Sequence, residues 1–280
     1  MNNNYIVSAA PHVRSRETTA AILRDVLVAL APAALFGVCT YGFRAFLVLL
    51  LSVSSCVLSE YLYKKVRKIP GGDYECSAVV TGLLLGLNLP ADIPYWMPVL
   101  GGAFAVVVIK MLFGGLGRNL LNPALAAKCL LLLCFGLAGE AIGEGNTLLL
   151  LLGGLYLVLC RVISLRLPVA YLLSFAGYIV CVRLFGGSGL EADYLIGQVW
   201  NSGLLLGAFF MATDYVTSPM TRWGKVIYGV FLGVLTGVIS MLGNTTEGVT
   251  FAILIGNLLV PVIEKITLPH FFGKGKKAKV

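Results

Sequence analysis

Charged residues are scarce in this sequence. Only 12% of the 280 residues are Asp, Glu, Lys or Arg, whereas 58% are hydrophobic and the mean hydropathy is +0.91. So little polar surface cannot cover a soluble globule of this size, which excludes a soluble domain. The net charge is +8, and in a soluble protein that excess would indicate nucleic acid as a partner. Here the cytoplasmic loops of a membrane protein account for it, and no nucleic-acid partner is expected.

Histidine and paired cysteine are also lacking. The two histidines, His12 and His270, lie outside the apolar segments, and no Ser/His/Asp or Cys/His arrangement suggests hydrolysis. The seven cysteines are scattered without a CxxC pair, so we expect small buried hydrophobes in place of a disulfide framework or an iron–sulfur or zinc site. The sequence therefore predicts no catalytic side chain and no metal site.

The polar N-terminal segment, residues 1–19, has no short hydrophobic core followed by a small-residue cleavage site, so we expect no signal peptide and a cytoplasmic N-terminus. Most of the apolar segments that follow approach the length of about 20 residues that a helix needs to cross a bilayer, although two are short. We predict an all-α polytopic membrane protein with about ten transmembrane helices. The ten segments are 20–41, 44–63, 77–90, 95–113, 121–138, 147–163, 168–184, 194–212, 226–242 and 248–266.

The positive charges support ten spans. With both termini cytoplasmic, every Lys and Arg except Arg44 and Arg183 falls on the inner side, and Lys110 and Lys128 are allowed to lie partly in the membrane. We expect a single transmembrane domain at 20–266. The basic tail at 267–280 either binds an anionic inner leaflet or is an ordinary solvated tail.

Two spans carry the same motif. GLLLG occurs at 82–86 in the third span and at 203–207 in the eighth, and each copy leads into a polar exit that ends in proline, at Pro90 and Pro219. The predicted topology makes these spans run in opposite directions. That arrangement is typical of an inverted repeat of five plus five helices, here about 20–138 and 147–266, in which broken helices hold ligands or ions near the midplane. A chance match in a leucine-rich protein is the alternative.

A glycine-rich stretch lies between the fourth and fifth spans. It reads FGGLGRNLLNPA over 113–124, where the glycines allow positive φ and Asn122-Pro123 starts a new helix. A helix N-terminus beside Arg118 and Asn119 is a suitable seat for an anion or phosphate, and a tight turn between helices is the alternative. Ionisable groups at membrane depth are costly, so we expect a function for any that proves to be buried among Lys110, Asp73, Glu75, Lys128, Asp214 and Glu247.

Six stretches of the sequence, in order along nearly the whole chain, resemble one family. The GGLGxNxxNPA and FMATDYxTSP signatures among them are specific. The sequence resembles the D subunits of Rnf electron-transport complexes, which are related to the B subunit of the sodium-pumping NADH:quinone oxidoreductase. The stretches are PHVRS at 11–15, SAVVTGLLLGLNLP at 77–90, LFGGLGRNLLNPALAAK at 112–128, GGLYLVLCRVISLRLPVAY at 153–171, GAFFMATDYVTSP at 207–219 and EGVTFAILIGN at 247–257.

The resemblance implies a subunit of an inner-membrane complex that couples electron flow between ferredoxin and NAD to movement of Na⁺ or H⁺. The partners it implies are the lipid bilayer and the other Rnf subunits, A, B, C, E and G. It also implies FMN esterified through its phosphate to a Thr in the outer connection between the fifth and sixth spans. In this chain that connection is shortened and lacks the family's attachment motif; Thr147 is its one Thr and hence the candidate for covalent FMN.

A non-covalent flavin, FMN or riboflavin, is the second expectation. The repeat would enclose a planar, mostly apolar site edged by glycine backbone, and the redox chemistry would belong to the cofactor. Two other hypotheses remain open: a flavin-poor scaffold that carries the ion path, and a solitary transporter that binds a small solute near Thr81 and Ser202. The polar groups expected around the site are Thr81, Asn88, Arg118, Asn119, Asn122, Asp214, Thr217 and Ser218.

Overall fold

The computed structural model describes residues 18–68, 76–137, 139–186, 193, 196–198, 203–243 and 247–268. Most of the N-terminal segment, nearly all of the basic tail and much of the first half of the predicted eighth span lie outside these residues. Across the described ranges the chain is helical, and the β-structure there is one isolated bridge between Pro90 and Ala141. The predicted all-α class is confirmed.

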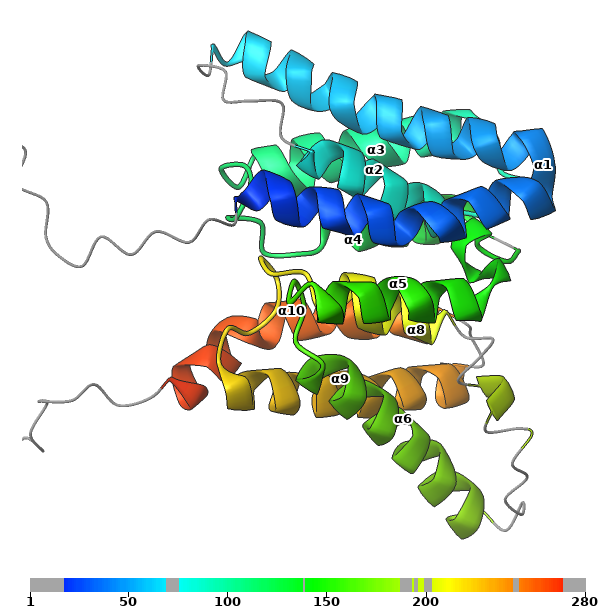
Figure 1. Ribbon diagram of the computed structural model, residues 1–280, viewed down its shortest axis with the longest axis vertical. Coiled ribbons are helices and arrows are strands. Elements are labelled where there is room, and N and C mark those ends of the chain that lie inside the picture. The colour runs from blue at the N-terminus through cyan, green and yellow to red at the C-terminus, as the bar shows by residue number, and fades with distance from the viewer. Residues whose placement is uncertain are drawn as a thin grey trace, which may run out of the picture.

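The helices follow the order of the predicted spans (Figure 1). Four helices in the described part of the chain are long and apolar enough to cross a membrane: α1 (Thr19–Val66), α6 (Arg166–Phe185), α9 (Arg222–Gly243) and α10 (Gly248–Thr267). The shorter elements are α2 (Ser77–Leu87), α3 (Trp96–Phe104), α4 (Pro123–Phe135), the 3-10 turn η2 (Ile142–Gly145), α5 (Thr147–Leu159) and α8 (Leu204–Leu206). Two π-helices, η1 (Ala105–Met111) and η3 (Gly207–Met211), continue α3 and α8.

The element α1 contains two predicted spans, because the chain reverses inside it. Gly42 has φ +73° and ψ −158°, values outside the helical range that a residue without Cβ adopts readily. Figure 1 shows the two arms of α1 folded back beside each other. The predicted spans 20–41 and 44–63 correspond to these arms.

The two GLLLG copies run in opposite directions. The turn η2 lies against the end of α2 and also against α8, since a Cβ placed on Gly143 would stand 3.0 Å from Leu87 and 3.4 Å from Leu206. A Cβ on Gly203, the residue before α8, would also meet the side chain of Glu144 in η2. The element α2 therefore runs towards η2, whereas α8 starts beside it and runs away. The opposite directions that an inverted repeat requires of these two elements are confirmed.

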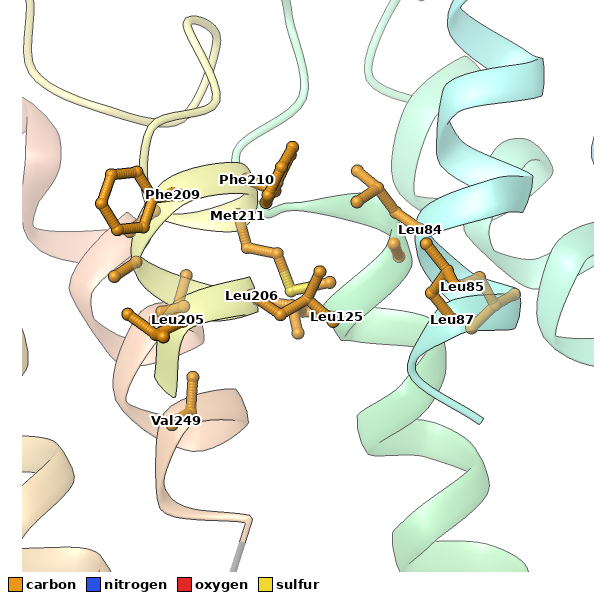
Figure 2. Close-up of a cluster of buried hydrophobic side chains, with 14 of the residues drawn as sticks. Leu84, Leu85, Leu87, Leu125, Leu205, Leu206, Phe209, Phe210, Met211 and Val249 are labelled. Carbon is orange, nitrogen blue, oxygen red and sulfur yellow. The ribbon is translucent and has the colours of Figure 1, made fainter. Parts of the chain in front are cut away.

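These two short elements form the centre of the apolar core. Figure 2 shows leucines of α2 on one side, side chains of α8 and η3 on the other, and Leu125 of α4 between them. Every residue from Leu204 to Met211 is buried. A helix that is apolar on all sides belongs inside a protein. The labelled core residues are Leu84, Leu85, Leu87, Leu125, Leu205, Leu206, Phe209, Phe210, Met211 and Val249.

The long helices α6 and α9 pack closely through glycine. Gly229, Gly233 and Gly237 of α9 recur every four residues and face α6. A Cβ on Gly233 would stand 2.5 Å from the carbonyl oxygen of Tyr171 and 2.7 Å from the backbone nitrogen of Phe175. Small residues of this kind let membrane helices approach to backbone contact.

We expect Gly233→Leu to destabilise the protein by about 1–3 kcal/mol, because the new side chain meets backbone atoms that cannot move aside. The matched control is Gly177→Leu on α6, where a Cβ meets nothing within 4 Å. Thermal unfolding of the purified protein in detergent should show a lower midpoint for the first variant and little change for the second. Equal midpoints for both variants would contradict this packing.

Candidate functional site

A cavity of about 220 Å³ lies at the end of the molecule where α1 and α2 begin. Its walls come from both halves of the chain: the first turns of α1, one side of α2, residues 116–124, the end of α5, η3 and the turn after η3. Apolar side chains predominate, Phe209 and Phe210 among them. A mostly apolar cavity with a few convergent polar groups is the usual form of a small-molecule site. Its polar lining comprises Ser77, Thr81, Lys110, Asn119, Asn122, Thr213 and Asp214.

Most of the predicted site residues gather at or beside this cavity. Thr81, Asn119, Asn122 and Asp214 line it. Two more lie next to these residues. The hydroxyl of Thr217 donates to Oδ2 of Asp214 at 3.2 Å, and Ser218 lines an adjoining pocket that shares Thr213, Tyr215 and two apolar residues with the cavity.

The other three predicted residues neither line the cavity nor belong to the turn beside it. Asn88 is buried at the end of α2, where its amide donates to the carbonyl oxygen of Leu84 at 2.8 Å. The side chain of Arg118 is exposed and runs alongside Gly114. Thr147 is the first residue of α5 and is buried beside η2, whereas the cavity lies at the other end of that helix.

Asn122 joins the two halves of the chain at the cavity wall. Its extended backbone and the following proline end the loop that precedes α4. Its Oδ1 accepts hydrogen bonds from the backbone nitrogens of Ala124 at 3.1 Å and Leu125 at 3.4 Å. This is an N-cap with proline at the first helical position, as the Asn-Pro pair predicts. The amide Nδ2 reaches across to the carbonyl oxygen of Met211 at 3.4 Å, so one side chain closes the start of α4 and contacts the end of η3.

Asn257 completes the same junction from α10, and it was absent from the predicted site. In the amide orientation that satisfies its neighbours, its nitrogen lies 3.2 Å from the carbonyl oxygen of Thr217 and 2.8 Å from the hydroxyl of Tyr228, and its oxygen accepts from the backbone nitrogen of Asn122 at 3.0 Å. Asn257 therefore ties the turn after η3 to the start of α4. An amide within an otherwise apolar helix is the sequence signal that would have found it.

Asp214 stabilises the turn after η3. Its carboxylate accepts from the backbone nitrogen of Val216 at 3.3 Å and from the Thr217 hydroxyl. Burial raises the pKa of Asp214 above its ordinary value, and these two hydrogen bonds act in the opposite direction. The carboxyl group is thus held in place at the wall of the cavity.

Lys110 supplies a buried positive charge at the cavity wall. It belongs to the π-helix η1, and its side chain is only 3% exposed. Its Nζ lies 2.7 Å from Oε2 of Glu60 and 2.6 Å from the hydroxyl oxygen of Ser77. Single π-helical turns occur frequently at functional sites. Glu60 was not expected in the site, because only packing brings the second arm of α1 against η1.

A second buried ion pair lies away from the cavity. Nζ of Lys128 in α4 is 2.7 Å from Oε2 of Glu247, the residue that precedes α10. The charge count placed Lys128 towards the inner side, but its side chain is 6% exposed and points to the end of the molecule opposite the cavity. This pair links the first half of the chain to the last helix.

The fold and the cavity define an integral membrane protein with short, interrupted helices around an internal site that mixes apolar walls with a few amides and charges. Across the described residues no cluster of His, Cys, Asp and Glu could hold a metal ion. The chain belongs to the NQR2, RnfD, RnfE family, whose model matches residues 6–139 and 132–273.

Curated relatives match the chain over nearly its whole length. It is 36% identical to the D subunit of the Na⁺-translocating ferredoxin:NAD⁺ oxidoreductase complex of Acetobacterium woodii, over 99% of this chain and 98% of the relative. Identity is 33% to the D subunit of the proton-translocating ferredoxin:NAD⁺ oxidoreductase complex of Clostridium ljungdahlii, over 97% of each. It is 28% to the D subunit of the ion-translocating oxidoreductase complex of Actinobacillus succinogenes, over 96% of this chain and 98% of the relative.

The alignments also bear on the shortened connection. The alignment with the Acetobacterium woodii relative runs over 319 positions, although this chain has 280 residues, so the chain lacks residues that the relative has. The two stretches that match the family model meet at 132–139, where α4 ends and the connection to α5 begins. Both observations agree with a connection that is shorter than in the family.

We expect Asn122→Ala to destabilise the protein by about 1–2 kcal/mol, because it removes the N-cap of α4 and the bond to Met211. The matched control is Asn122→Ser, since serine caps a helix well but cannot reach Met211, and we expect about half the loss. Chemical unfolding in detergent checks both values. A wild-type midpoint for the alanine variant would contradict the role of Asn122 at this junction.

Proposed function

We propose that this protein is the D-type membrane subunit of an Rnf-type complex, in which electron transfer between ferredoxin and NAD⁺ drives ion translocation. The observation that carries the proposal is the 36% identity to a D subunit over nearly the whole of both chains. Its partners would be the A, B, C, E and G subunits and the lipid bilayer. The coupling ion would be Na⁺ or H⁺, which the names of two relatives give respectively.

We further propose the cell inner membrane as its location, with both termini and the cavity on the cytoplasmic side. Two observations support this orientation. Two of the basic residues predicted on the inner side, Lys64 and Lys110, lie at the cavity end. Arg44 stands at the opposite end, beside the reversal in α1, and pairs with Asp92 at 3.2 Å. This is the charge asymmetry of cytoplasmic and external loops.

We place a non-covalent flavin, FMN or riboflavin, in the cavity. The lining fits such a group: aromatic and aliphatic side chains suit a planar ring system, and amide, hydroxyl and charged groups at the edges suit its polar rim. A bound flavin would supply the electron transfer. The chain itself would do the rest: Thr81, Asn119 and Lys110 would orient the ring, and the apolar walls would exclude water.

The shortened connection favours a second candidate, a scaffold subunit that keeps the ion path and assembly surface but has no flavin of its own. Flavin analysis of the purified complex separates the two. After denaturation and gel separation, the proposal expects no fluorescence on the band of this chain and flavin in the supernatant. Fluorescence on the band would point to covalent FMN at Thr147 or another Thr. An unchanged flavin content in a complex that lacks this chain would favour the scaffold.

The cavity assignment predicts that Thr81→Phe lowers the flavin content of the complex at least about tenfold, because the added ring occupies the space of the cofactor. The matched control is Val79→Phe, a half-buried position of the same helix that does not line the cavity. Flavin released per complex, measured by fluorescence, should fall only in the first variant. Full flavin content with Thr81→Phe would move the cofactor elsewhere.

Asp214 gives a prediction for ion coupling. Asp214→Asn keeps the shape of the side chain but removes its charge at the cavity wall, and we expect ion uptake by reconstituted complex to fall at least about tenfold. The matched control is Asp92→Asn, since that carboxylate is 87% exposed at the opposite end. Unchanged electron transfer and unchanged ion uptake in Asp214→Asn would remove this residue from the ion path.

A further inference from the structure

The buried charges beside the cavity form a cluster of three. Oε2 of Glu60 lies 2.7 Å from Nζ of Lys110, and its Oε1 lies 2.8 Å from Nζ of Lys64. One carboxylate is therefore shared by two ammonium groups, and the cluster carries a net charge of +1. A buried ion pair of this kind is weak evidence for a stabilising role, because the cost of removing both charges from water can exceed their attraction.

The two ammonium groups differ in their surroundings. The side chain of Lys64 is 24% exposed, so solvent screens its charge, whereas that of Lys110 is 3% exposed. Because Lys64 also draws on the Glu60 carboxylate, the charge of Lys110 is incompletely balanced where the dielectric constant is low. A charge in such surroundings acts strongly on whatever occupies the neighbouring space.

That space is the cavity, since Lys110 and Ser77 both line it. An ammonium group has three N–H donors, and the hydrogen bonds of Nζ in the described part of the chain go to Glu60 and Ser77. A third donor is left for a bound molecule. The other charged side chain on the cavity wall is Asp214, which its own turn already holds through Val216 and Thr217.

We propose that Lys110 donates to the polar edge of the bound ring and favours the reduced, more negatively charged form of the cofactor, with Glu60 as the positioning residue that limits this charge. The inference rests on the flavin site proposed above. Electrons from reduced ferredoxin, a partner given in the names of two relatives' complexes, would add negative charge to the ring, and a fixed positive charge beside it would make that addition more favourable. No covalent bond to Lys110 forms or breaks.

The test is the reduction potential of the flavin in the intact complex, followed by spectroelectrochemical titration of wild type and variants. Lys110→Gln changes the net charge of the cluster from +1 to 0. The ratio of reduced to oxidised flavin at a fixed potential should therefore fall about tenfold, which corresponds to a reduction potential lower by about 59 mV for a one-electron step. Glu60→Gln takes it from +1 to +2 and should raise the ratio by a similar factor. The control, Lys64→Gln, alters the solvent-screened charge and should change the ratio less than about threefold.

Shifts of opposite sign separate electrostatic action from a structural role, since a disturbed fold would move both variants in one direction or in none. Unchanged potentials, or shifts of the same sign, with flavin still bound would overturn the inference and leave the proposed function standing. A wild-type complex without flavin attributable to this chain would overturn the flavin site and the inference with it. If one variant does not assemble, the sign of the shift in the other decides.

Discussion

The structure depends on satisfying helix ends inside an apolar body. The elements α2, α4 and η3 stop or start within the molecule, and backbone groups left at such ends need partners where water is excluded. Three asparagines supply them. Asn88 ends α2, and Asn122 caps α4 and contacts the last residue of η3. Asn257 of α10 contacts the turn after η3 and the backbone nitrogen of Asn122 before α4. One junction of amides therefore holds the two halves of the chain together, and it lies next to the cavity, which Asn122 lines.

The cavity is a consequence of these interruptions. Next to it, where the helices are continuous, leucines of α2, α4 and α8 fill the centre, as Figure 2 shows. Where η3 stops, the turn that follows it brings Asp214 to one wall, and the π-helix η1 brings Lys110 to another. Because most of the lining is apolar, these charges act over short distances with little screening. The broken helices thus provide both the space and the electrostatic character of the site.

Local signals were readable in the sequence, and pairings across the fold were not. TGLLLGLNLP and the Asn122-Pro123 pair predicted a short helix and a capped helix start, because a Pro-ended exit and an N-cap act within a few residues. The break between the two arms of α1 was predicted by the separate apolar segments 20–41 and 44–63. The partner of Lys110 was hidden, since Glu60 lies fifty positions away and meets it only through packing. Arg118 and Asn88 were expected at the site from their motifs, but a motif does not say which side of a turn a side chain takes.

The two flavin expectations concern different places in the molecule. Thr147 begins α5 beside η2, and the cavity lies beyond the other end of that helix. Thirteen helical residues span roughly 20 Å at 1.5 Å each, so a cofactor on Thr147 and a cofactor in the cavity would be separate redox centres. Shortening the connection before α5 alters the surroundings of Thr147. It leaves the amide junction and the cavity intact. A shorter connection is therefore compatible with the proposed flavin site, because the residues that line the cavity lie outside that connection.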